Sequence, residues 1–311
     1  MARLRVIFAG SGAFGLPTLK ALVQSHEVIQ VVSQPDRPAG RGRKLHPTPI
    51  SEFAIEHNLP LLRTADINAE PLPAADVMVV IAFGQKIVDP VVNHPRFGSI
   101  NLHASRLPKY RGAAPVNWAI ISGETVTGNS VIRLAQKMDA GAVLAQSSLA
   151  IGETETAGEL HDRLAEDGVA LVQRVLEDLA AGRAVETPQD ESQATLAPKL
   201  SRASAVIDWS KPAAQVAHQI RGMSPWPGCR VRLLDTTGAE LARLTLLRAR
   251  PNGCEGTRWN PGEIMMHGCI QCGDGEVQVL EVQPEGRRPM PLDAYQRGNP
   301  WCPGMRVESV T

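Results

Sequence analysis

The sequence predicts an α/β protein in which a doubly wound, mostly parallel sheet is followed by a small C-terminal β-barrel. In the first half of the chain, short runs of aliphatic and β-branched residues alternate with longer helical patterns. Such continuous apolar runs are typical of strands that helices cover on both faces of a parallel sheet. Beyond residue 205 the runs are separated by Gly, Pro, Asn and Asp, which is typical of a barrel of short strands.

The elements of the first half follow in a regular order. We expect strands at residues 5–9, 28–33, 77–82, 99–103, 130–134 and 143–146. A long helix is expected over residues 157–181, because Thr156 and Glu159 form a capping box and Gly182 supplies a C-terminal stop. Its apolar stripe has helical spacing and consists of Leu160, Leu164, Leu171, Val175 and Leu179.

The second half begins after a polar, proline-containing stretch at residues 188–204. One helix is expected at residues 213–221, followed by strands at residues 229–234, 244–250, 262–266 and 277–283. A barrel of short strands often carries oligonucleotide contacts, as in the OB fold. We therefore predict an N-terminal α/β domain at residues 1–188, a linker at residues 189–205 and an OB-like barrel domain at residues 206–311.

The composition excludes several classes of protein. The chain has 311 residues, 43% of them hydrophobic, and its 32 Lys and Arg balance its 32 Asp and Glu. A neutral protein of this kind does not coat nucleic acid or an anionic membrane through bulk charge. The longest apolar run, residues 77–83, is far too short to span a bilayer, and the N-terminal pattern is not that of a signal peptide. We expect a cytoplasmic protein that has no membrane partner.

The five cysteines all follow residue 228, and an odd number in a large chain argues against a disulfide framework. Cys269 and Cys272 have the spacing of half a zinc site, with Cys254 and His267 nearby. A single CxxC is a weak signal for a metal. We therefore expect ordinary thiols, an ordinary His267 and no metal.

Three glycines follow the first strand, Gly10, Gly12 and Gly15, and Asp36 lies at the distance of a ribose-binding acid. This is the fingerprint of a Rossmann-type dinucleotide site and suggests a nicotinamide-dependent oxidoreductase. The same glycines fit equally well a crowded β-to-α turn that binds no cofactor. Because Asp36 stands in a loop rich in proline and glycine and not at a strand end, the second interpretation is favoured.

Residues 34–45 form a basic loop. It carries four positive charges within eight residues, namely Arg37, Arg41, Arg43 and Lys44. Its prolines and glycines are expected to deny it regular structure and to leave it exposed and mobile. A basic loop taken alone is more often merely solvated, but one of this kind can also fold around a phosphate backbone.

Two polar side chains stand where the strand at residues 99–103 ends. Asn101 and His103 are two residues apart, so they project from the same face of the sheet. An amide donor and an imidazole that face one point can stabilise an oxyanion and move a proton, as the transfer of a carbonyl carbon requires. Asp139, near the end of the following strand, is the expected partner of the histidine. Each residue alone has an ordinary structural explanation, but together at neighbouring strand ends they favour a site.

Several blocks of the chain, read in order, resemble the signature segments of methionyl-tRNA formyltransferases. They lie at residues 34–45, 77–84, 101–115, 137–141, 188–208 and 224–228 and so cover nearly the whole chain. The resemblance implies a catalytic formyltransferase domain at residues 1–188 and a barrel at residues 206–311 that helps to hold tRNA. It also implies the reaction: the formyl group of 10-formyltetrahydrofolate passes to the α-amino group of methionyl initiator tRNA, for translation initiation.

The resemblance further implies roles for individual residues. Asn101, His103 and Asp139 match the catalytic residues of the family. The residues expected to line the folate site are Ser105, Arg106, Leu107 and Pro108, together with the main chain of Phe83, Gly84 and Lys86. Those expected to hold the acceptor end of the tRNA are Arg37, Arg41, Arg43 and Lys44. The implied protein is a monomer that uses a tetrahydrofolate co-substrate and no metal.

The residues leave three alternatives open. A related folate enzyme that formylates a small amine, or hydrolyses formylfolate, would share the catalytic residues but would not need both the basic loop and the barrel. A NAD-dependent oxidoreductase would need only the glycine fingerprint and would leave Asn101 and His103 unexplained. A tRNA-binding module without catalytic activity would not need the intact set of Asn101, His103 and Asp139.

Overall fold

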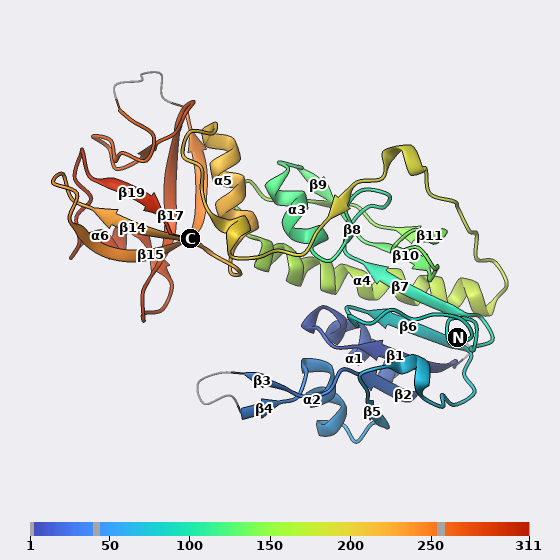
Figure 1. The fold of residues 1–311 in the computed structure, drawn as a ribbon. Helices are drawn as coiled ribbons and strands as arrows, with labels where there is room; N and C mark the ends of the chain where they lie inside the picture. Colours follow the sequence, from blue (N-terminus) through green and yellow to red (C-terminus); the bar gives the residue numbers. More distant parts are fainter. Residues whose placement is uncertain (1–2, 40–43, 254–258, 311) are drawn as a thin grey trace. The chain divides into compact units, whose positions relative to one another are not determined.

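The computed structural model describes residues 3–39, 44–253 and 259–310, and Figure 1 shows its fold. The chain divides into two compact units, each built from segments that are distant in the sequence. The first unit consists of Met1–Gly112, Gly128–Leu149 and His161–Leu196, and the second of Ala113–Thr127, Ala150–Leu160 and Ala197–Thr311. The predicted domain limits of residues 1–188, 189–205 and 206–311 stay a prediction.

A seven-stranded sheet forms the centre of the first unit (Figure 1), in the order β11-β10-β7-β6-β1-β2-β5. Strands β7, β6, β1, β2 and β5 run parallel, β10 is antiparallel to β7, and β11 is antiparallel to β10. The strands are β1 (Arg5–Gly10), β2 (Glu27–Ser33), β5 (Leu61–Arg63), β6 (Val77–Ile81), β7 (Ser99–His103), β10 (Ser130–Arg133) and β11 (Val143–Gln146). The predicted mostly parallel sheet is confirmed, and the short β5 is an addition to it.

The central strands of this sheet are the most apolar. Every residue of β6 is buried, and in β1 only the first residue, Arg5, is exposed. Side chains such as Ile7, Val32 and Met78 belong to one buried cluster. Burial on both faces is the reason that these strands are continuous apolar runs and show no alternating pattern.

Helices of the first unit begin with recognisable signals. Helix α1 (Leu16–Ser25) has a proline in its first turn, and α2 (Pro49–Glu56) is capped by Thr48, whose hydroxyl accepts a hydrogen bond from the backbone N–H of Ser51 at 3.1 Å. Helix α4 (Ala157–Ala180), which begins in the second unit and continues in the first, agrees with the predicted helix to within one residue. No helix in the described part of the chain is long and apolar enough to cross a membrane.

The prediction that the basic loop lacks regular structure is wrong for the parts that the structure describes. Strand β3 (Arg37–Ala39) pairs antiparallel with β4 (Lys44–His46), so the two ends of the loop form a short ribbon. Pro38 fits this ribbon because a two-stranded pair has open edges, where a missing N–H donor costs no hydrogen bond. Arg41 and Arg43 lie outside the described residues.

A six-stranded antiparallel sheet forms a nearly closed barrel in the second unit. Its strands follow the path β16-β17-β15-β14-β19, and β18 pairs with β17. They are β14 (Cys229–Leu234), β15 (Glu240–Asn252), β16 (Ile270–Gln271), β17 (Glu276–Pro284), β18 (Met290–Pro291) and β19 (Arg306–Ser309). Glu263 bridges to Arg306 of β19 and Ile264 bridges to Ile270 of β16, so this segment links the two ends of the path. The barrel is confirmed, although the strand expected at residues 262–266 exists only as these two bridges.

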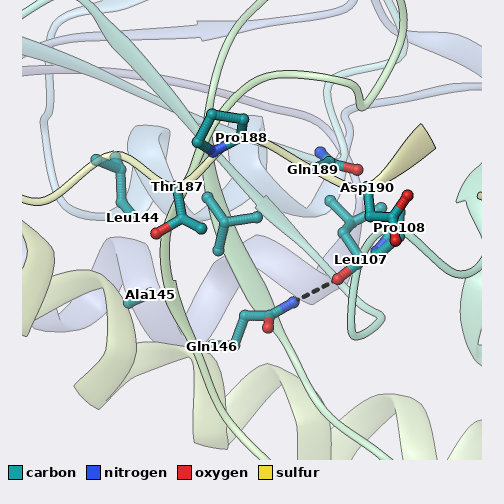
Figure 2. Close-up of a pocket in the computed structure, with 10 residues that line it drawn as sticks. Leu107, Pro108, Leu144, Ala145, Gln146, Thr187, Pro188, Gln189 and Asp190 are labelled. Carbon is teal, nitrogen blue, oxygen red and sulfur yellow. Dashed lines mark hydrogen bonds between the residues drawn. The ribbon is translucent and has the colours of Figure 1, made fainter. Parts of the chain in front are cut away.

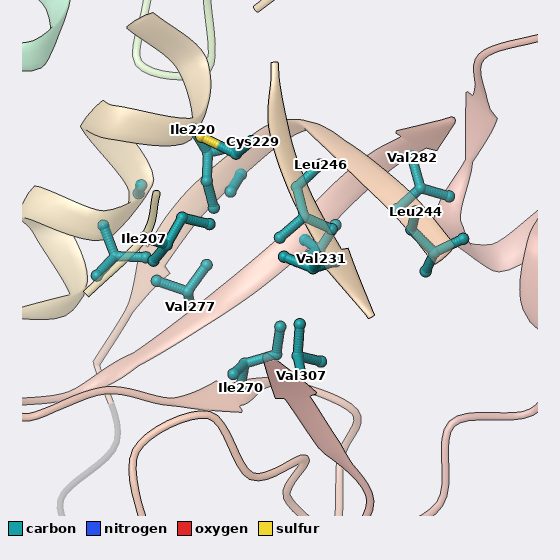
Figure 3. Close-up of a cluster of buried hydrophobic side chains, with 14 of the residues drawn as sticks. Ile207, Ile220, Cys229, Val231, Leu244, Leu246, Ile270, Val277, Val282 and Val307 are labelled. Atoms are coloured by element: carbon teal, nitrogen blue, oxygen red, sulfur yellow. The ribbon is translucent and has the colours of Figure 1, made fainter. Parts of the chain in front are cut away.

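The barrel encloses its own hydrophobic core, part of which is drawn in Figure 3. Val231, Leu246 and Val277 of the barrel strands pack with Ile220 of α5 (Ala213–Gly222) in this cluster. Two further helices of the unit are α3 (Pro115–Ile121) and α6 (Leu292–Gln296). The remaining elements are short: β8 (Arg111–Gly112), β9 (Val126–Thr127), β12 (Leu149–Ala150), β13 (Leu196–Ala197), η1 (Ala13–Gly15), η2 (Ile67–Ala69), η3 (Glu191–Gln193) and η4 (Ala203–Ala205).

Candidate active site

Asn101 and His103 lie at the carboxyl end of β7. Asn101 pairs with Val80 of β6 and Ile132 of β10, and His103 pairs with Ser130 of β10. Both side chains therefore leave the same face of the sheet, as the alternation of a strand requires. Asn101 is half-buried, and His103 is 6% exposed. Two hydrogen-bonding side chains thus share a largely dehydrated strand end.

The imidazole of His103 has a defined tautomer. Its Nε2 lies 2.9 Å from the backbone carbonyl oxygen of Tyr110. Because a carbonyl oxygen only accepts hydrogen bonds, Nε2 carries a proton and donates it. In the neutral imidazole, Nδ1 is then the unprotonated nitrogen, which can take a proton from a reacting group.

Asp139 approaches that free nitrogen. Its Oδ2 lies 3.7 Å from His103 Nδ1 and accepts a hydrogen bond from the backbone N–H of Gly112 at 2.8 Å. The residue follows β10 in a turn and has φ +52°, a left-handed conformation that costs a residue other than glycine about 1 kcal/mol or more. The carboxylate can therefore stabilise an imidazolium formed when Nδ1 accepts a proton.

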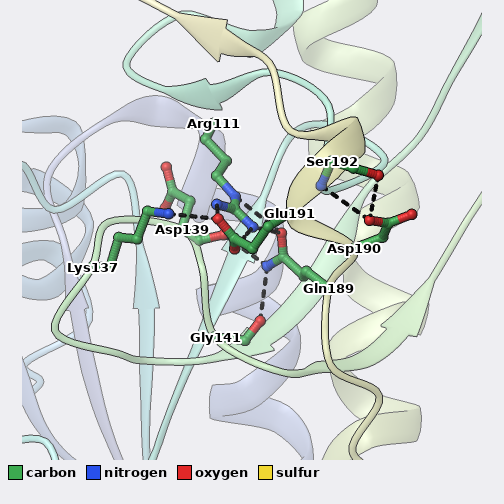
Figure 4. A network of polar contacts seen from close by, with 8 residues as sticks. All are labelled: Arg111, Lys137, Asp139, Gly141, Gln189, Asp190, Glu191 and Ser192. Atoms are coloured by element: carbon green, nitrogen blue, oxygen red, sulfur yellow. Dashed lines mark hydrogen bonds and ion pairs between the residues drawn. The ribbon is translucent and has the colours of Figure 1, made fainter.

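A polar network, drawn in Figure 4, holds the turn that carries Asp139. The side-chain amide of Gln189 donates to the backbone oxygens of Asp139 and Gly141, both at 2.8 Å. The amide oxygen of Gln189 accepts from Arg111 Nη2 at 2.7 Å and Nε at 3.0 Å. Since a guanidinium only donates, the orientation of the amide is fixed. Gln189 thus positions Asp139 through the backbone.

Arg111 is itself held by an acidic partner. Its side chain is 4% exposed and makes two parallel contacts with Glu191, Nη2 to Oε1 at 2.7 Å and Nη1 to Oε2 at 3.1 Å. Lys137 Nζ also lies 2.5 Å from Glu191 Oε2. These hydrogen bonds, first that from Arg111 and then that from Lys137, lower the pKa of Glu191 to about 2. No pattern in the sequence indicates a role for Arg111, Gln189 or Glu191.

Of the residues expected at the folate site, four lie in the loop after β7: Ser105, Arg106, Leu107 and Pro108. Ser105 Oγ donates to the backbone oxygen of Lys109 at 2.6 Å, and the backbone N–H of Leu107 donates to Ser130 Oγ at 3.0 Å. Ser105 and Leu107 are buried, whereas Arg106 is exposed. The first bond lies within the loop, and the second ties the loop to β10.

A cavity of about 310 Å³ lies beside this loop (Figure 2). Leu107 and Pro108 form part of its wall, and Gln146 donates from Nε2 to the backbone oxygen of Leu107 at 2.8 Å. Gln189 also lines the cavity, and it is the residue that holds the backbone of Asp139. The other lining residues are Val143, Leu144, Ala145, Thr187, Pro188 and Asp190. Asn101, His103 and Asp139 are not among the lining residues, so the cavity borders the site without containing it.

The loop after β6 holds the other residues expected to contact folate. The side chain of Phe83 is buried in the core, and its backbone oxygen accepts from Gln34 Nε2 at 2.7 Å and Ser11 Oγ at 3.2 Å. Gly84 has φ +76°, which suits glycine, and Lys86 is exposed. A ligand at this loop would therefore meet main chain and not the ring of Phe83.

The glycine fingerprint has a packing explanation. A Cβ at Gly10 would lie 2.7 Å from the ring of Phe8 and 2.9 Å from the backbone oxygen of Ile81. One at Gly15 would lie 3.0 Å from the same ring. Asp36, the expected ribose partner, forms an ion pair with Arg63 Nη1 at 2.7 Å. These contacts favour the interpretation in which the glycines relieve crowding.

Among the four basic residues expected to bind tRNA, Arg37 and Lys44 lie in β3 and β4. Arg37 is exposed, and its Nη2 donates to Gln34 Oε1. The structure thus links the start of the basic loop, through Gln34, to the loop at Phe83.

A doubly wound sheet carries an amide and an imidazole at the end of β7, and a carboxylate from the turn after β10 lies beside them. Together with a small antiparallel barrel in the same chain, this arrangement indicates the class of formyl transferases. Residues 2–176 match the family described as formyl transferase, and residues 199–300 match the family described as formyl transferase, C-terminal domain.

Two curated relatives identify the family within this class. The chain is 39% identical to methionyl-tRNA formyltransferase of Geobacter sulfurreducens, over 99% of this chain and 98% of the relative. It is 42% identical to that of Paracoccus denitrificans, over 95% of this chain and 97% of the relative. The chain belongs to the methionyl-tRNA formyltransferase family.

A solved structure supports the fold. The N-formyltransferase from Helicobacter canadensis, in complex with folinic acid and dTDP-3-aminofucose, is similar with a TM-score of 0.65. It is 15% identical, and the match covers 90% of this chain and 99% of that one.

Proposed function

We propose that this protein transfers the formyl group of 10-formyltetrahydrofolate to the α-amino group of methionyl initiator tRNA, giving formylmethionyl-tRNA for translation initiation. Membership of the methionyl-tRNA formyltransferase family supports this reaction. The observation that carries the chemistry is the position of His103 beside Asn101: its Nε2 faces the backbone carbonyl of Tyr110, and its Nδ1 lies 3.7 Å from Asp139 Oδ2.

The reaction begins with the free amine. An α-amino group has a pKa of about 7.7 to 8.0, so a useful neutral fraction exists near neutral pH. Its nitrogen forms a bond to the formyl carbon, and the carbonyl oxygen becomes an oxyanion. The side-chain amide of Asn101 donates a hydrogen bond to this oxyanion, in a site where burial of neighbouring groups strengthens the interaction.

Collapse of the intermediate needs a proton transfer. His103 Nδ1 accepts the proton that the attacking amine loses, and Asp139 stabilises the resulting imidazolium. The imidazolium then protonates N10 of the folate as the bond between N10 and the formyl carbon breaks. The formyl group is then bonded to the α-amino nitrogen, N10 of the folate carries the proton, and the histidine returns to its starting tautomer.

The binding residues are proposals of the same kind. A folate donor is supported by the folinic acid bound to the structurally similar N-formyltransferase. We assign the folate contacts to Ser105, Arg106, Leu107, Pro108, Phe83, Gly84 and Lys86, and the tRNA contacts to Arg37, Arg41, Arg43 and Lys44. The protein would act as a monomer in the cytoplasm.

The deciding experiment is a formylation assay with 10-formyltetrahydrofolate and charged initiator methionyl-tRNA. Charged elongator methionyl-tRNA, a small amine and a nicotinamide reduction assay run beside it. We expect formylation of the initiator tRNA and little of the others. Release of formate without transfer, or turnover of nicotinamide, would contradict the proposal.

A further inference from the structure

Three metal-binding types of side chain gather in the barrel, in the second unit. They are His267, Cys269 and Glu276, and their donor atoms all lie within 4.8 Å of one another. Glu276 is 1% exposed and Cys269 is 3% exposed, whereas the side chain of His267 is 45% exposed. A buried thiol and a buried carboxylate thus meet an imidazole that solvent can reach.

The strand register brings these residues together. Glu276 opens β17, where it pairs with Asn252 at the end of β15 and with Gln271 of β16. Cys269 immediately precedes β16, and its backbone oxygen accepts from the N–H of Met265 at 2.8 Å. Gly268 closes this turn with φ +81°, a conformation that suits glycine. The turn therefore places His267 and Cys269 against the start of β17.

The side chains converge on one point. His267 Nε2 lies 2.8 Å from each carboxylate oxygen of Glu276. Asn252 Nδ2 approaches Cys269 Sγ at 3.7 Å and also donates to Glu276 Oε1. A single imidazole N–H can satisfy only part of such a carboxylate, and a cation in this position would contact all three donors.

We propose that His267, Cys269 and Glu276 form a site for a divalent cation of the zinc type, a function that goes beyond formyl transfer. Zinc binds at about 2.3 Å from sulfur and about 2.0 to 2.2 Å from nitrogen and oxygen, so tetrahedral ligand atoms stand about 3.4 to 3.7 Å apart. The donor atoms of the cluster are up to 4.8 Å apart, so shifts of about 1 Å would bring them to the spacing that zinc requires. Binding releases the thiol proton of Cys269 to solvent and breaks the hydrogen bond between His267 and Glu276. The imidazole proton moves from Nε2 to Nδ1, so that Nε2 can bind the metal.

The donor set also indicates which metal is preferred. Thiolate and imidazole select zinc over magnesium or calcium, which prefer oxygen ligands. Three protein ligands leave a fourth position for water. Asn252 would orient two of the ligands from outside the coordination sphere.

This site differs from the one suggested by the CxxC spacing. Cys272 Sγ points to the backbone oxygen of Ile270 at 3.9 Å, and Cys272 does not belong to the cluster found among the described residues. Glu276, four residues further along, takes its place. From the sequence we expect an ordinary His267 and no metal; we replace that expectation with a cation bound by His267, Cys269 and Glu276.

The test is metal binding by the full-length protein after chelator treatment and dialysis. Zinc is titrated in competition with a chromophoric chelator, and cobalt is titrated as a spectroscopic probe. We expect one zinc per chain, and with cobalt a sulfur-to-metal charge-transfer band that reports a thiolate ligand. Cys269→Ser should remove the band, and His267→Ala and Glu276→Gln should weaken zinc binding by about 10-fold or more.

Matched controls isolate the cluster. Cys302→Ser removes an exposed thiol elsewhere in the barrel unit, and His94→Ala removes an exposed histidine of the first unit; both should bind zinc like the parent protein. Because His267 is partly exposed, His267→Ala is the variant expected to fold, and thermal unfolding in chelator checks this. The proposal is overturned if the parent protein binds no zinc, or if Cys269→Ser and His267→Ala bind it unchanged. Formylation activity plays no part in these readouts, so the outcome is independent of the proposed function.

Discussion

At the scale of single residues, the proposed proton transfer falls to Nδ1 of His103 and not to Nε2, because Nε2 is engaged by the backbone carbonyl of Tyr110 at 2.9 Å. Asp139 sits on the Nδ1 side, 3.7 Å away, too far for a direct hydrogen bond and near enough to interact with a charged ring. In the mechanism proposed above, the Asp139 carboxylate would therefore stabilise the imidazolium of His103.

Removing the side chain of His103 or of Asn101 should impair catalysis. We expect His103→Ala and Asn101→Ala each to lower kcat about 100- to 1,000-fold, because each removes a group that acts on the oxyanion or the proton. The measurement is single-turnover formylation of initiator methionyl-tRNA. His94→Ala, at an exposed histidine bonded to the Pro73 backbone, should keep the parent rate. Near-normal turnover by His103→Ala would refute the role given to the imidazole.

Gln189 should act on kcat through Asp139. Gln189→Ala removes the two hydrogen bonds to the backbone oxygens of Asp139 and Gly141, together with the two that the amide oxygen accepts from Arg111. We expect about a 10-fold loss of kcat with little change in the KM for tRNA. Gln189→Glu loses the same donors while keeping an oxygen for Arg111, so its kcat should fall similarly.

Gln193→Ala is the matched control, since its exposed amide contacts Asp190 in the neighbouring turn. Kinetics of the three variants, with thermal unfolding measured alongside, would separate positioning from folding. Equal kcat for Gln189→Ala and Gln193→Ala would rule out the positioning role.

Some of these roles are visible in sequence and others are not. Asn101 and His103 follow from strand alternation, which fixes the common face of residues two apart. Gln189 is 50 residues from Asp139 and 78 from Arg111 along the chain. Because it contacts the backbone of Asp139 and not its side chain, no local pattern in the sequence indicates that Gln189 and Asp139 interact. Such contacts depend on the path of the whole chain.

At the scale of elements, the start of α4 combines a local and a distant interaction. Thr156 donates from both its backbone N–H and its hydroxyl to Glu159 Oε2, at 2.9 Å each, which completes the predicted capping box. Arg248 of β15 then binds both oxygens of Glu159, at 2.7 and 2.9 Å. These hydrogen bonds, first that from Arg248, lower the pKa of Glu159 from 4.5 to about 2.

The lowered pKa predicts how Glu159 contributes to stability. A carboxylate with a depressed folded pKa stabilises the protein above its unfolded pKa, and this contribution is lost as the pH falls from about 4.5 toward 2. Glu159→Gln should lower the free energy of unfolding by about 1 kcal/mol at neutral pH, since the side chain is half exposed and solvent screens the pair.

The measurement is urea unfolding of both proteins as a function of pH. The difference between them should shrink on acidification. Glu166→Gln, an exposed position on the same helix, should change stability little at any pH. A constant difference down to the lowest pH at which the protein folds would contradict the assigned pKa.

Helix α4 shows which features of an element can be predicted from the sequence and which cannot. The capping box and apolar stripe are local, so they predict the bounds of α4 to within one residue. Arg248 lies 89 residues from Glu159, and only folding reveals that contact. The two strands of the basic loop were missed because Pro38 and the glycines obscure a pairing of three residues on each side.

At the scale of the whole molecule, a formal net charge of zero means that affinity for tRNA must arise from local basic groups. We expect Arg41→Ala to raise the KM for initiator tRNA and to leave the KM for 10-formyltetrahydrofolate unchanged. If Arg41 contacts a phosphate, the slope of log KM against log salt concentration should fall by roughly 1.

Steady-state kinetics at several salt concentrations provide the check. Arg183→Ala, at an exposed arginine paired with Asp178, is the control and should retain the parent slope. An equal loss toward both substrates would count against a loop dedicated to tRNA.

The way the sheets end has a consequence for the protein at high concentration. In the barrel, residues 263–264 occupy positions beside β16 and β19, where a strand of another copy could otherwise add. In the first unit, Val143 of β11 exchanges two backbone hydrogen bonds with Thr187, and the opposite edge, β5, is only three residues long. Covered and short edges hinder intermolecular β-pairing. Both units therefore protect a translation enzyme against edge-to-edge aggregation.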